Sequence, residues 1–118
     1  MSETNGHAVT LAEAKDKARR KTVKVPIEAF GGDVVLREMG GRERDEWEDL
    51  STLATERKSV RGIMGNLISM CWVDESGERV CKPEDTDDFP ASVVSELFEK
   101  CIEINRITQR DVEVMAKN

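Results

Sequence analysis

The sequence predicts a single α+β domain that is mainly α-helical, in which an N-terminal helix and a β-hairpin pack on a small helical bundle and a second short hairpin follows. The chain has 118 residues, a length that suits one domain. Apolar and polar residues alternate before the glycine pair at residues 31–32, and a short apolar run follows it, as in a hairpin. Farther along, apolar residues recur every three or four positions, which indicates helices with one buried face.

The N-terminal segment is expected to contain a leader and a short helix. Residues 1–9 are mostly polar and are predicted to form a flexible leader, while residues 10–118 form the domain. Thr10 and Glu13 have the spacing of a capping box, so a helix is expected over residues 11–20. Its apolar stripe is narrow, and a helix this short needs a surface to lie against.

The first hairpin is predicted from residues 23–36. Apolar side chains alternate with polar ones and a proline over residues 23–27, which places three apolar side chains on one face of a strand. Because Pro26 cannot donate a ladder hydrogen bond, this strand is expected at a sheet edge. Residues 31–33 supply the reversal, and residues 34–36 return as the second strand.

The rest of the chain is expected to be largely helical. Two helices are predicted between residues 42 and 71. Gly62 and Gly65 weaken the interior of the second one and would allow close approach of another backbone, and a helix break near residues 59–62 is the alternative. A small hairpin turn, a short helix from Pro83, a long helix from Pro90 and a final segment capped by Thr108 follow. The expected apolar face comprises Trp47, Leu50, Leu53, Ala54, Val60, Ile63, Met64, Leu67, Ile68, Cys71, Val94, Leu97, Phe98, Cys101 and Ile102.

The composition argues against several classes of function. The net charge is −6, which disfavours general coating of nucleic acid, and no apolar run is long enough to cross a membrane. The single histidine, His7, lies in the leader, so a cysteine nucleophile would lack a base. The three cysteines contain no Cys-x-x-Cys pair, which argues against a zinc site and a disulfide framework. We therefore expect no catalytic residue, metal or cofactor.

Two segments are candidate partner-binding sites. In the C-terminal segment, Val112, Val114 and Met115 cannot all face one side of a helix, so at least one is expected to be exposed for contact. Arg19, Arg20 and Lys21 belong to a basic stretch that either contacts an acidic partner or simply keeps the surface solvated; the second interpretation is favoured. Trp47 and Trp72 are alternative anchors, although a tryptophan in an apolar stripe is more often a core residue.

Several segments, taken in order, resemble the tail assembly chaperones of long-tailed bacteriophages. The resemblance spans about residues 21–118. Arg106 departs from it, because a glycine is expected after the asparagine that ends the last long helix. The resembling segments are the hairpin residues 23–26 and 31–38, the helix start at residues 41–48, the aspartate-x-x-glycine turn at residues 74–79, and residues 96–105, similar to a last long helix that typically ends in leucine-asparagine.

The resemblance implies a noncatalytic protein that coats the tape measure protein and keeps it soluble until tail tube subunits polymerise around it. It also implies self-association, a place in the host bacterial cytoplasm, and absence from the mature virion. The family commonly yields a longer product by ribosomal frameshifting, and such a form would engage the tail tube protein. Ala116-Lys117-Asn118 can be encoded as the slippery run A AAA AAC, although chance explains this ending equally well.

Two other interpretations remain open. A regulatory or nucleic-acid-binding adaptor would contact phosphate through the basic arm at residues 11–24, against the acidity of the whole chain. A head–tail joining protein would instead remain in the virion as a structural component. The two alternatives differ from the chaperone in their salt dependence and in their presence in purified particles.

Overall fold

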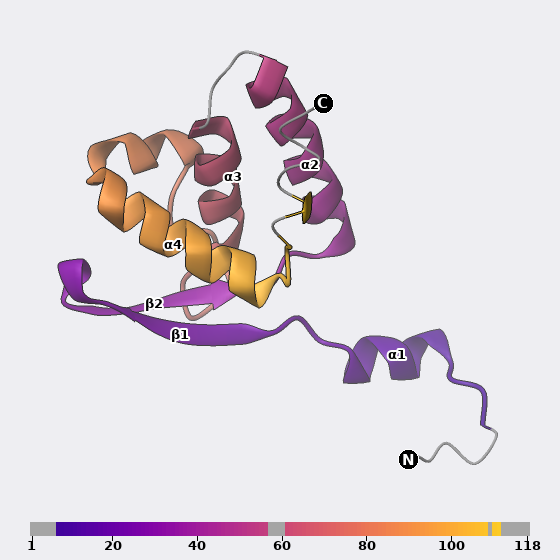
Figure 1. The fold of residues 1–118 in the computed structure, drawn as a ribbon. Helices are drawn as coiled ribbons and strands as arrows, with labels where there is room; N and C mark the ends of the chain where they lie inside the picture. Colours follow the sequence, from indigo (N-terminus) through magenta and orange to yellow (C-terminus); the bar gives the residue numbers. More distant parts are fainter. Residues whose placement is uncertain (1–6, 57–60, 109, 112–118) are drawn as a thin grey trace.

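The computed structural model describes residues 7–56, 61–108 and 110–111 (Figure 1). Within these ranges, four α-helices and a three-stranded antiparallel sheet confirm the predicted α+β class. The elements, in chain order, are α1 (Leu11–Lys17), β1 (Thr22–Ile27), the 3-10 helix η1 (Glu28–Phe30), β2 (Gly32–Arg37), α2 (Gly41–Glu56), α3 (Arg61–Cys71), β3 (Trp72–Val73), the 3-10 helix η2 (Pro83–Asp88) and α4 (Ala91–Ile104).

The sheet has the order β1-β2-β3, and α4 lies along one of its faces, with α3 beside it (Figure 1). The predicted hairpin is confirmed: Val25 pairs with Val34, and both point into the core. Gly31 makes the reversal with a φ of 69°, a conformation that favours glycine. β1 is an edge strand, so the N–H that Pro26 lacks would face the free side of the sheet.

The predicted second short hairpin is present, with β3 as its first strand. Asp74 does form the expected turn, because its Oδ1 accepts the N–H groups of Ser76 and Glu78 at 2.8 and 3.0 Å. The returning segment pairs with β3 through a bridge from Arg79 to Val73 and through the Val80 N–H, which donates to the carbonyl oxygen of Trp72 at 3.1 Å. β3 also pairs with β2, since α3 ends at Cys71 and delivers the next two residues to the open edge of that strand.

The core lies between the sheet and the helices. Trp47 is fully buried, as expected, and its indole Nε1 donates a hydrogen bond to the carbonyl oxygen of Ile63 at 3.0 Å. This bond joins α2 to α3 and satisfies the indole N–H inside the core. Leu97 and Cys101 are the fully buried residues of α4. Leu53 was expected in the core but is 43 % exposed, because it lies toward the end of α2 that points away from the sheet (Figure 1).

Two close contacts fix the η2 segment against the rest of the fold. A Cβ added at Gly65 would lie 2.9 Å from the carbonyl oxygen of Pro83, so the expected close approach of a second backbone is confirmed. Phe89 follows η2, and its ring centroid lies 5.3 Å from that of Phe30 at the hairpin tip. Trp72 stacks on Phe30 at 5.6 Å, so three aromatic rings close this end of the core.

α1 differs from the prediction in its length and packing. Its capping box is present: the N–H of Glu13 donates to the hydroxyl of Thr10 at 3.2 Å, and the N–H of Thr10 donates to the Glu13 carboxylate at 2.9 Å. The helix ends at Lys17 rather than near residue 20, and none of its residues is buried. α1 projects away from the body (Figure 1), because the chain leaves the sheet in line with β1.

Asn105 joins three separate segments just after α4. Its Oδ1 accepts the N–H of Met39 at 2.8 Å, between β2 and α2. Its Nδ2 donates to the carbonyl oxygen of Cys101 at 2.8 Å and lies 3.2 Å from the sulfur of Cys71 at the end of α3. Asn105, the asparagine at the end of the segment that resembles the last long helix of the chaperones, therefore fixes α4 to α3 and to the β2–α2 connection.

The chain beyond Asn105 turns through a left-handed residue. Arg106 has a φ of 53°, its N–H donates to the carbonyl oxygen of Glu103, and the N–H of Ile107 donates to that of Ile102, both at 3.1 Å. These are the two hydrogen bonds of a Schellman motif, in which glycine is favoured at the left-handed position. Ile107 is 5 % exposed, which supplies the apolar contact that accompanies this motif.

Arg106→Gly is expected to raise the free energy of unfolding by about 0.5–1 kcal/mol, because glycine adopts a positive φ without the steric cost that a side chain pays. Chemical denaturation monitored by circular dichroism measures this change. Glu99→Gly in the exposed middle of α4 is the control and is expected to lower stability by about 1 kcal/mol. A loss of stability in both variants would contradict this account of the turn.

Asn105→Ala is expected to lower the free energy of unfolding by about 2–3 kcal/mol, because it leaves the Met39 N–H without its partner beside the core. Thr52→Ala removes a half-buried hydroxyl that donates to the Glu48 carbonyl oxygen at 3.1 Å and is expected to cost less than about 0.5 kcal/mol. Equal losses in the two variants, measured by denaturant unfolding, would show that Asn105 does not join the three segments.

Candidate partner-binding surface

The predicted C-terminal contact residues, Val112, Val114 and Met115, lie outside the residues that the structure describes. The start of their segment is described. The N–H of Asp111 donates to the hydroxyl of Thr108 at 3.1 Å, and the N–H of Thr108 donates to the Asp111 carboxylate at 2.9 Å. Thr108 therefore caps this segment as predicted.

The basic candidates Arg19, Arg20 and Lys21 do not form one free cationic patch. The guanidinium of Arg19 donates to the Asp16 carboxylate at 3.0 Å, and both side chains are largely exposed. The guanidinium of Arg20 donates to the carboxylate of Glu43 at 2.8 Å. The backbone of Lys21 pairs with Glu38, whose carboxylate accepts the Lys21 N–H at 3.0 Å. Arg20 and Lys21 thus anchor the N-terminal segment to the body.

Glu43 is the centre of this anchor. Its carboxylate accepts hydrogen bonds from Arg20 at 2.8 Å, from Arg79 at 2.9 Å and from the N–H of Gly40 at 3.0 Å. Partial burial opposes ionisation of the carboxyl group, but the Arg79 and Gly40 hydrogen bonds and the two guanidinium charges outweigh it and lower the pKa of Glu43. The group is therefore ionised at neutral pH and holds three segments together.

A groove of about 420 Å³ lies between the edge strand β1 and the C-terminal half of α4. Val23 forms part of its wall and is 42 % exposed, although the sequence pattern placed it on the buried face. Val25 also borders the groove but is only 8 % exposed and belongs to the core, whereas Val23 lies near the beginning of β1. The residues lining the groove are Val23, Lys24, Val25, Pro26, Lys100, Glu103 and Ile104.

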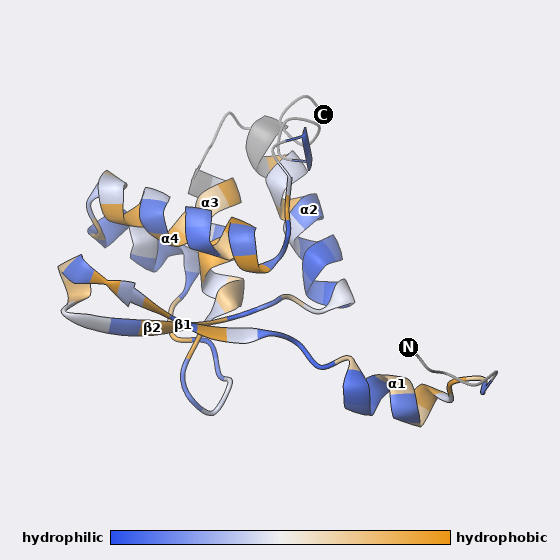
Figure 2. Cartoon of the chain, turned by 60° about the horizontal axis from the view of Figure 1, so that its bottom comes forward, coloured by the Kyte–Doolittle hydropathy of each residue, from blue (hydrophilic) through white to orange (hydrophobic). Residues whose placement is uncertain are grey.

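Exposed apolar side chains occur on the N-terminal segment, in the groove and at two further places in the described part of the chain. In the described part of the chain, Leu11 is 72 % exposed and Val9 62 %, and both belong to the projecting N-terminal segment. Figure 2 shows hydrophobic and strongly hydrophilic residues together on α1, which stands clear of the body. With Val23 in the groove, they offer apolar surface for a partner. Among the described residues, the other large apolar side chains that are exposed are Leu53 and Val80.

A smaller hollow of about 300 Å³ lies on the opposite face of the sheet. Val35, Val73 and Val80 supply its apolar side chains, and the ammonium of Lys24 forms an ion pair with Glu75 at 3.1 Å across it. Both paired side chains are mostly exposed, so the pair contributes little to stability. This face is a second, smaller apolar surface.

The cysteines are placed as small core residues rather than as exposed nucleophiles. Cys71 and Cys101 are fully buried and Cys81 is half-buried. Burial, with a contribution from the charge of Asp85, raises the pKa of Cys81 to about 11, so this thiol stays protonated at neutral pH. Among the described residues, no group of three or more histidine, cysteine, aspartate or glutamate side chains is placed to hold a metal ion.

Comparisons with protein-family models, with curated proteins and with solved structures find no match to this chain. In the described ranges, no helix is both long enough and apolar enough to span a membrane. The surfaces and anchors above therefore have to be interpreted from their own chemistry. The sequence identified Arg20 as a contact candidate. It did not predict the groove, because Val23 and Ile104 are far apart in sequence and come together only when β1 packs beside α4.

Glu43→Gln is expected to lower the free energy of unfolding by about 1–2 kcal/mol at pH 7, because the ionised carboxylate accepts charge-assisted hydrogen bonds. Its folded pKa is lowered, so this stabilisation is complete above the ordinary glutamate pKa of about 4.3 and is lost as the pH falls below it. Urea unfolding of the intact chain and of Glu43→Gln between neutral and acidic pH is expected to show their free energies of unfolding converging as the pH falls.

Glu48→Gln provides the matched control. Glu48 pairs with Arg44 at 2.8 Å within one helix, and its side chain is 45 % exposed. This change is expected to cost about 0.3–0.5 kcal/mol. A cost for Glu43→Gln no larger than that, or one that persists unchanged in acid, would show that Glu43 does not anchor the N-terminal segment.

Proposed function

We propose that this protein is a noncatalytic tail assembly chaperone of a long-tailed bacteriophage, which binds the tape measure protein and keeps it soluble until tail tube subunits polymerise around it. The proposal rests on the ordered segments that resemble this protein class. One structural observation carries it furthest: Arg106, where a glycine is expected, has a φ of 53°, the backbone conformation that glycine adopts most readily.

Two other resembling segments have defined structural roles. The asparagine that closes the last long helix, Asn105, bonds to Met39, Cys71 and Cys101. The aspartate-x-x-glycine segment forms a turn in which Asp74 caps the backbone and Gly77 has a φ of 93°. These roles give a physical reason for each residue at its position, which supports the correspondence between this chain and the family.

The groove between β1 and α4 is the proposed site for the client. Its apolar side chains, Val23 and Ile104, lie beside charged groups that keep the surface hydrated. Such a surface suits one apolar stripe of an amphipathic helix, the kind of segment expected in a long hydrophobic helical protein. The excess of acidic residues over the whole chain would keep the complex soluble.

Co-expression with the tape measure protein of the same phage, the client that the proposal names, tests the proposal. The intact chain is expected to keep that protein in the soluble fraction, and Val23→Asp is expected to reduce its soluble amount several-fold, because a carboxylate in the groove repels an apolar stripe. Val80→Asp changes the same residue type at a similar exposure, 48 % against 42 %, on the other face of the sheet. It is expected to leave solubility unchanged.

Three outcomes decide between the interpretations. A client that stays insoluble with the intact chain contradicts the chaperone proposal. A loss caused by Val80→Asp alone moves the binding site to the opposite face of the sheet. Recovery of this protein in stoichiometric amounts from purified particles would favour a head–tail joining protein, since an assembly factor leaves before maturation.

A further inference from the structure

Two of the three cysteines meet in the core, although they are far apart in sequence. Cys71 is the last residue of α3, and Cys101 lies in the last turn of α4. Both side chains are fully buried, both thiols are free, and the two thiols share a hydrogen bond. The packing of α4 against α3 therefore creates a pair of thiols that the spacing of the cysteines along the chain does not reveal.

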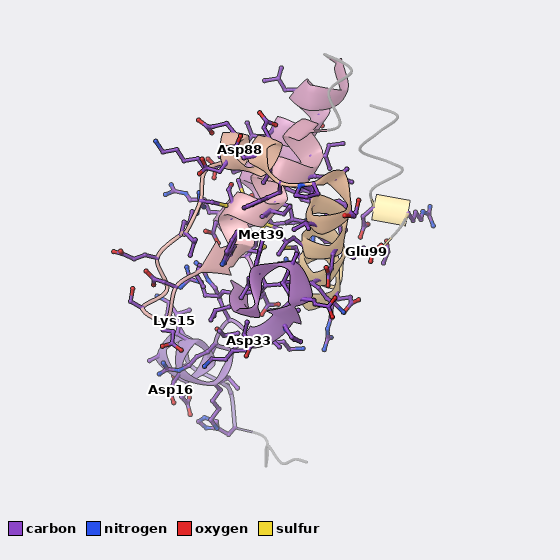
Figure 3. All side chains as sticks on the ribbon, turned by 90° about the vertical axis from the view of Figure 1, so that its left-hand side faces the viewer. Lys15, Asp16, Asp33, Met39, Asp88 and Glu99 are labelled. Carbon is purple, nitrogen blue, oxygen red and sulfur yellow. The ribbon has the colours of Figure 1, made fainter. Side chains whose placement is uncertain are left out.

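Asn105 holds the two helix ends that carry these cysteines. Its Nδ2 lies 3.2 Å from the sulfur of Cys71 and donates to the carbonyl oxygen of Cys101 at 2.8 Å. Its Oδ1 accepts the N–H of Met39, which lies inside the body, whereas Glu99 on α4 lies on the exposed side of that helix (Figure 3). One amide group with contacts on three segments thus keeps the two cysteines together.

The two thiols of the pair differ in acidity. The sulfur of Cys71 accepts the S–H of Cys101 and an N–H of Asn105, and these hydrogen bonds lower the pKa of Cys71 against the effect of burial. The hydrogen bond to Cys71, together with burial, raises the pKa of Cys101. The thiolate, which is the reactive form of cysteine, is therefore favoured at Cys71, while Cys101 keeps its proton.

Cys81 provides an internal comparison. It is half-buried and so more accessible than either core cysteine. Its pKa of about 11 keeps the sulfur protonated at neutral pH. Exposure alone favours reaction at Cys81, whereas the contact between two thiols and the acidity of one of them favour reaction at the pair. The identity of the cysteines that react therefore distinguishes these two causes.

We propose that Cys71 and Cys101 form a redox modification site, at which hydrogen peroxide converts the two buried thiols into a disulfide that joins α3 to α4. The Cys71 thiolate attacks one peroxide oxygen and breaks the O–O bond, which gives a sulfenic acid and hydroxide. The sulfur of Cys101 then attacks the sulfenic sulfur, forms the S–S bond and displaces the hydroxyl group, which leaves as water with the Cys101 proton. The hydroxide takes up the proton that Cys71 released, so the products are one disulfide and two molecules of water.

The size of the oxidant matters because both sulfurs lie inside the core. Hydrogen peroxide is close to water in size, and the ends of secondary-structure elements open more easily than their centres. An opening of the last turn of α4 uncovers the pair without unfolding the sheet, since Cys101 belongs to that turn. A larger oxidant, such as a disulfide, would have to place a mixed disulfide inside the core, which is why a peroxide is the proposed reactant.

Peptide mapping of the full chain tests the proposal. The reduced protein is treated with hydrogen peroxide at neutral pH, alkylated, and digested with trypsin under non-reducing conditions. Trypsin places the three cysteines in separate peptides, residues 62–79, 80–100 and 101–106. The expected product joins 62–79 to 101–106, is lighter than the two reduced peptides by two hydrogen atoms, and disappears after reduction with dithiothreitol. Peptide 80–100 is expected to carry an alkylated thiol.

Three variants separate the roles of the cysteines. In Cys101→Ser the sulfenic acid meets no second thiol, so dimedone is expected to label Cys71. In Cys71→Ser the remaining core thiol is expected to stay unreacted, because burial keeps Cys101 protonated. Cys81→Ser is the control and is expected to form the disulfide at the same rate as the intact chain.

Thermal unfolding measures whether the disulfide fits the native fold. The oxidised chain is expected to melt about 10 °C above the reduced chain, because the bond closes a loop of about thirty residues in the unfolded state. A disulfide that involves Cys81, one that forms only in urea concentrations that unfold the chain, or one that lowers the melting temperature would each overturn the proposal. None of these measurements needs a client, so their outcome is independent of the proposed function.

Discussion

The side chain of Asn105 is the contact on which the arrangement of the helices depends. Its carbonyl oxygen accepts the N–H of Met39, and its amide nitrogen reaches Cys101 in α4 and Cys71 at the end of α3. A primary amide can do this because it offers an acceptor and two donors on one rigid group. Leaving the Met39 N–H unpaired beside the core would carry a desolvation penalty, so these bonds specify one position of α4 over the sheet.

That position of α4 creates the surface that the proposed function uses. Ile104 ends α4 one residue before Asn105, and it faces Val23 across the groove. Arg106 then turns the chain away in a left-handed conformation, which lets Ile107 return to the core. The same few residues thus end the helix, complete the core and place the groove wall.

A second constraint is the carboxylate of Glu43 in the first turn of α2. It binds Arg20, Arg79 and the backbone of Gly40 at once. The guanidinium of Arg20 therefore joins the N-terminal segment to the body. Beyond this anchor, α1 stands away from the other elements (Figure 1).

Elements with a local cause could be predicted from the sequence. The capping box at Thr10, the edge position of β1 through Pro26, the burial of Trp47 and the close approach at Gly65 follow from side-chain chemistry and spacing along the chain. Periodicity could also give the class of the fold, since apolar repeats of two and of three to four residues distinguish strands from helices.

The tertiary structure alone decided which of these elements meet. The pairing of β3 with β2, the exposure of Val23 and the projection of α1 depend on the direction in which α3 and β1 deliver the chain. The groove was out of reach of sequence reasoning for the same reason, because its walls come from residues 23–26 and 100–104. A repeat along the chain reports which side chains share a face, whereas what covers that face depends on segments far away in sequence.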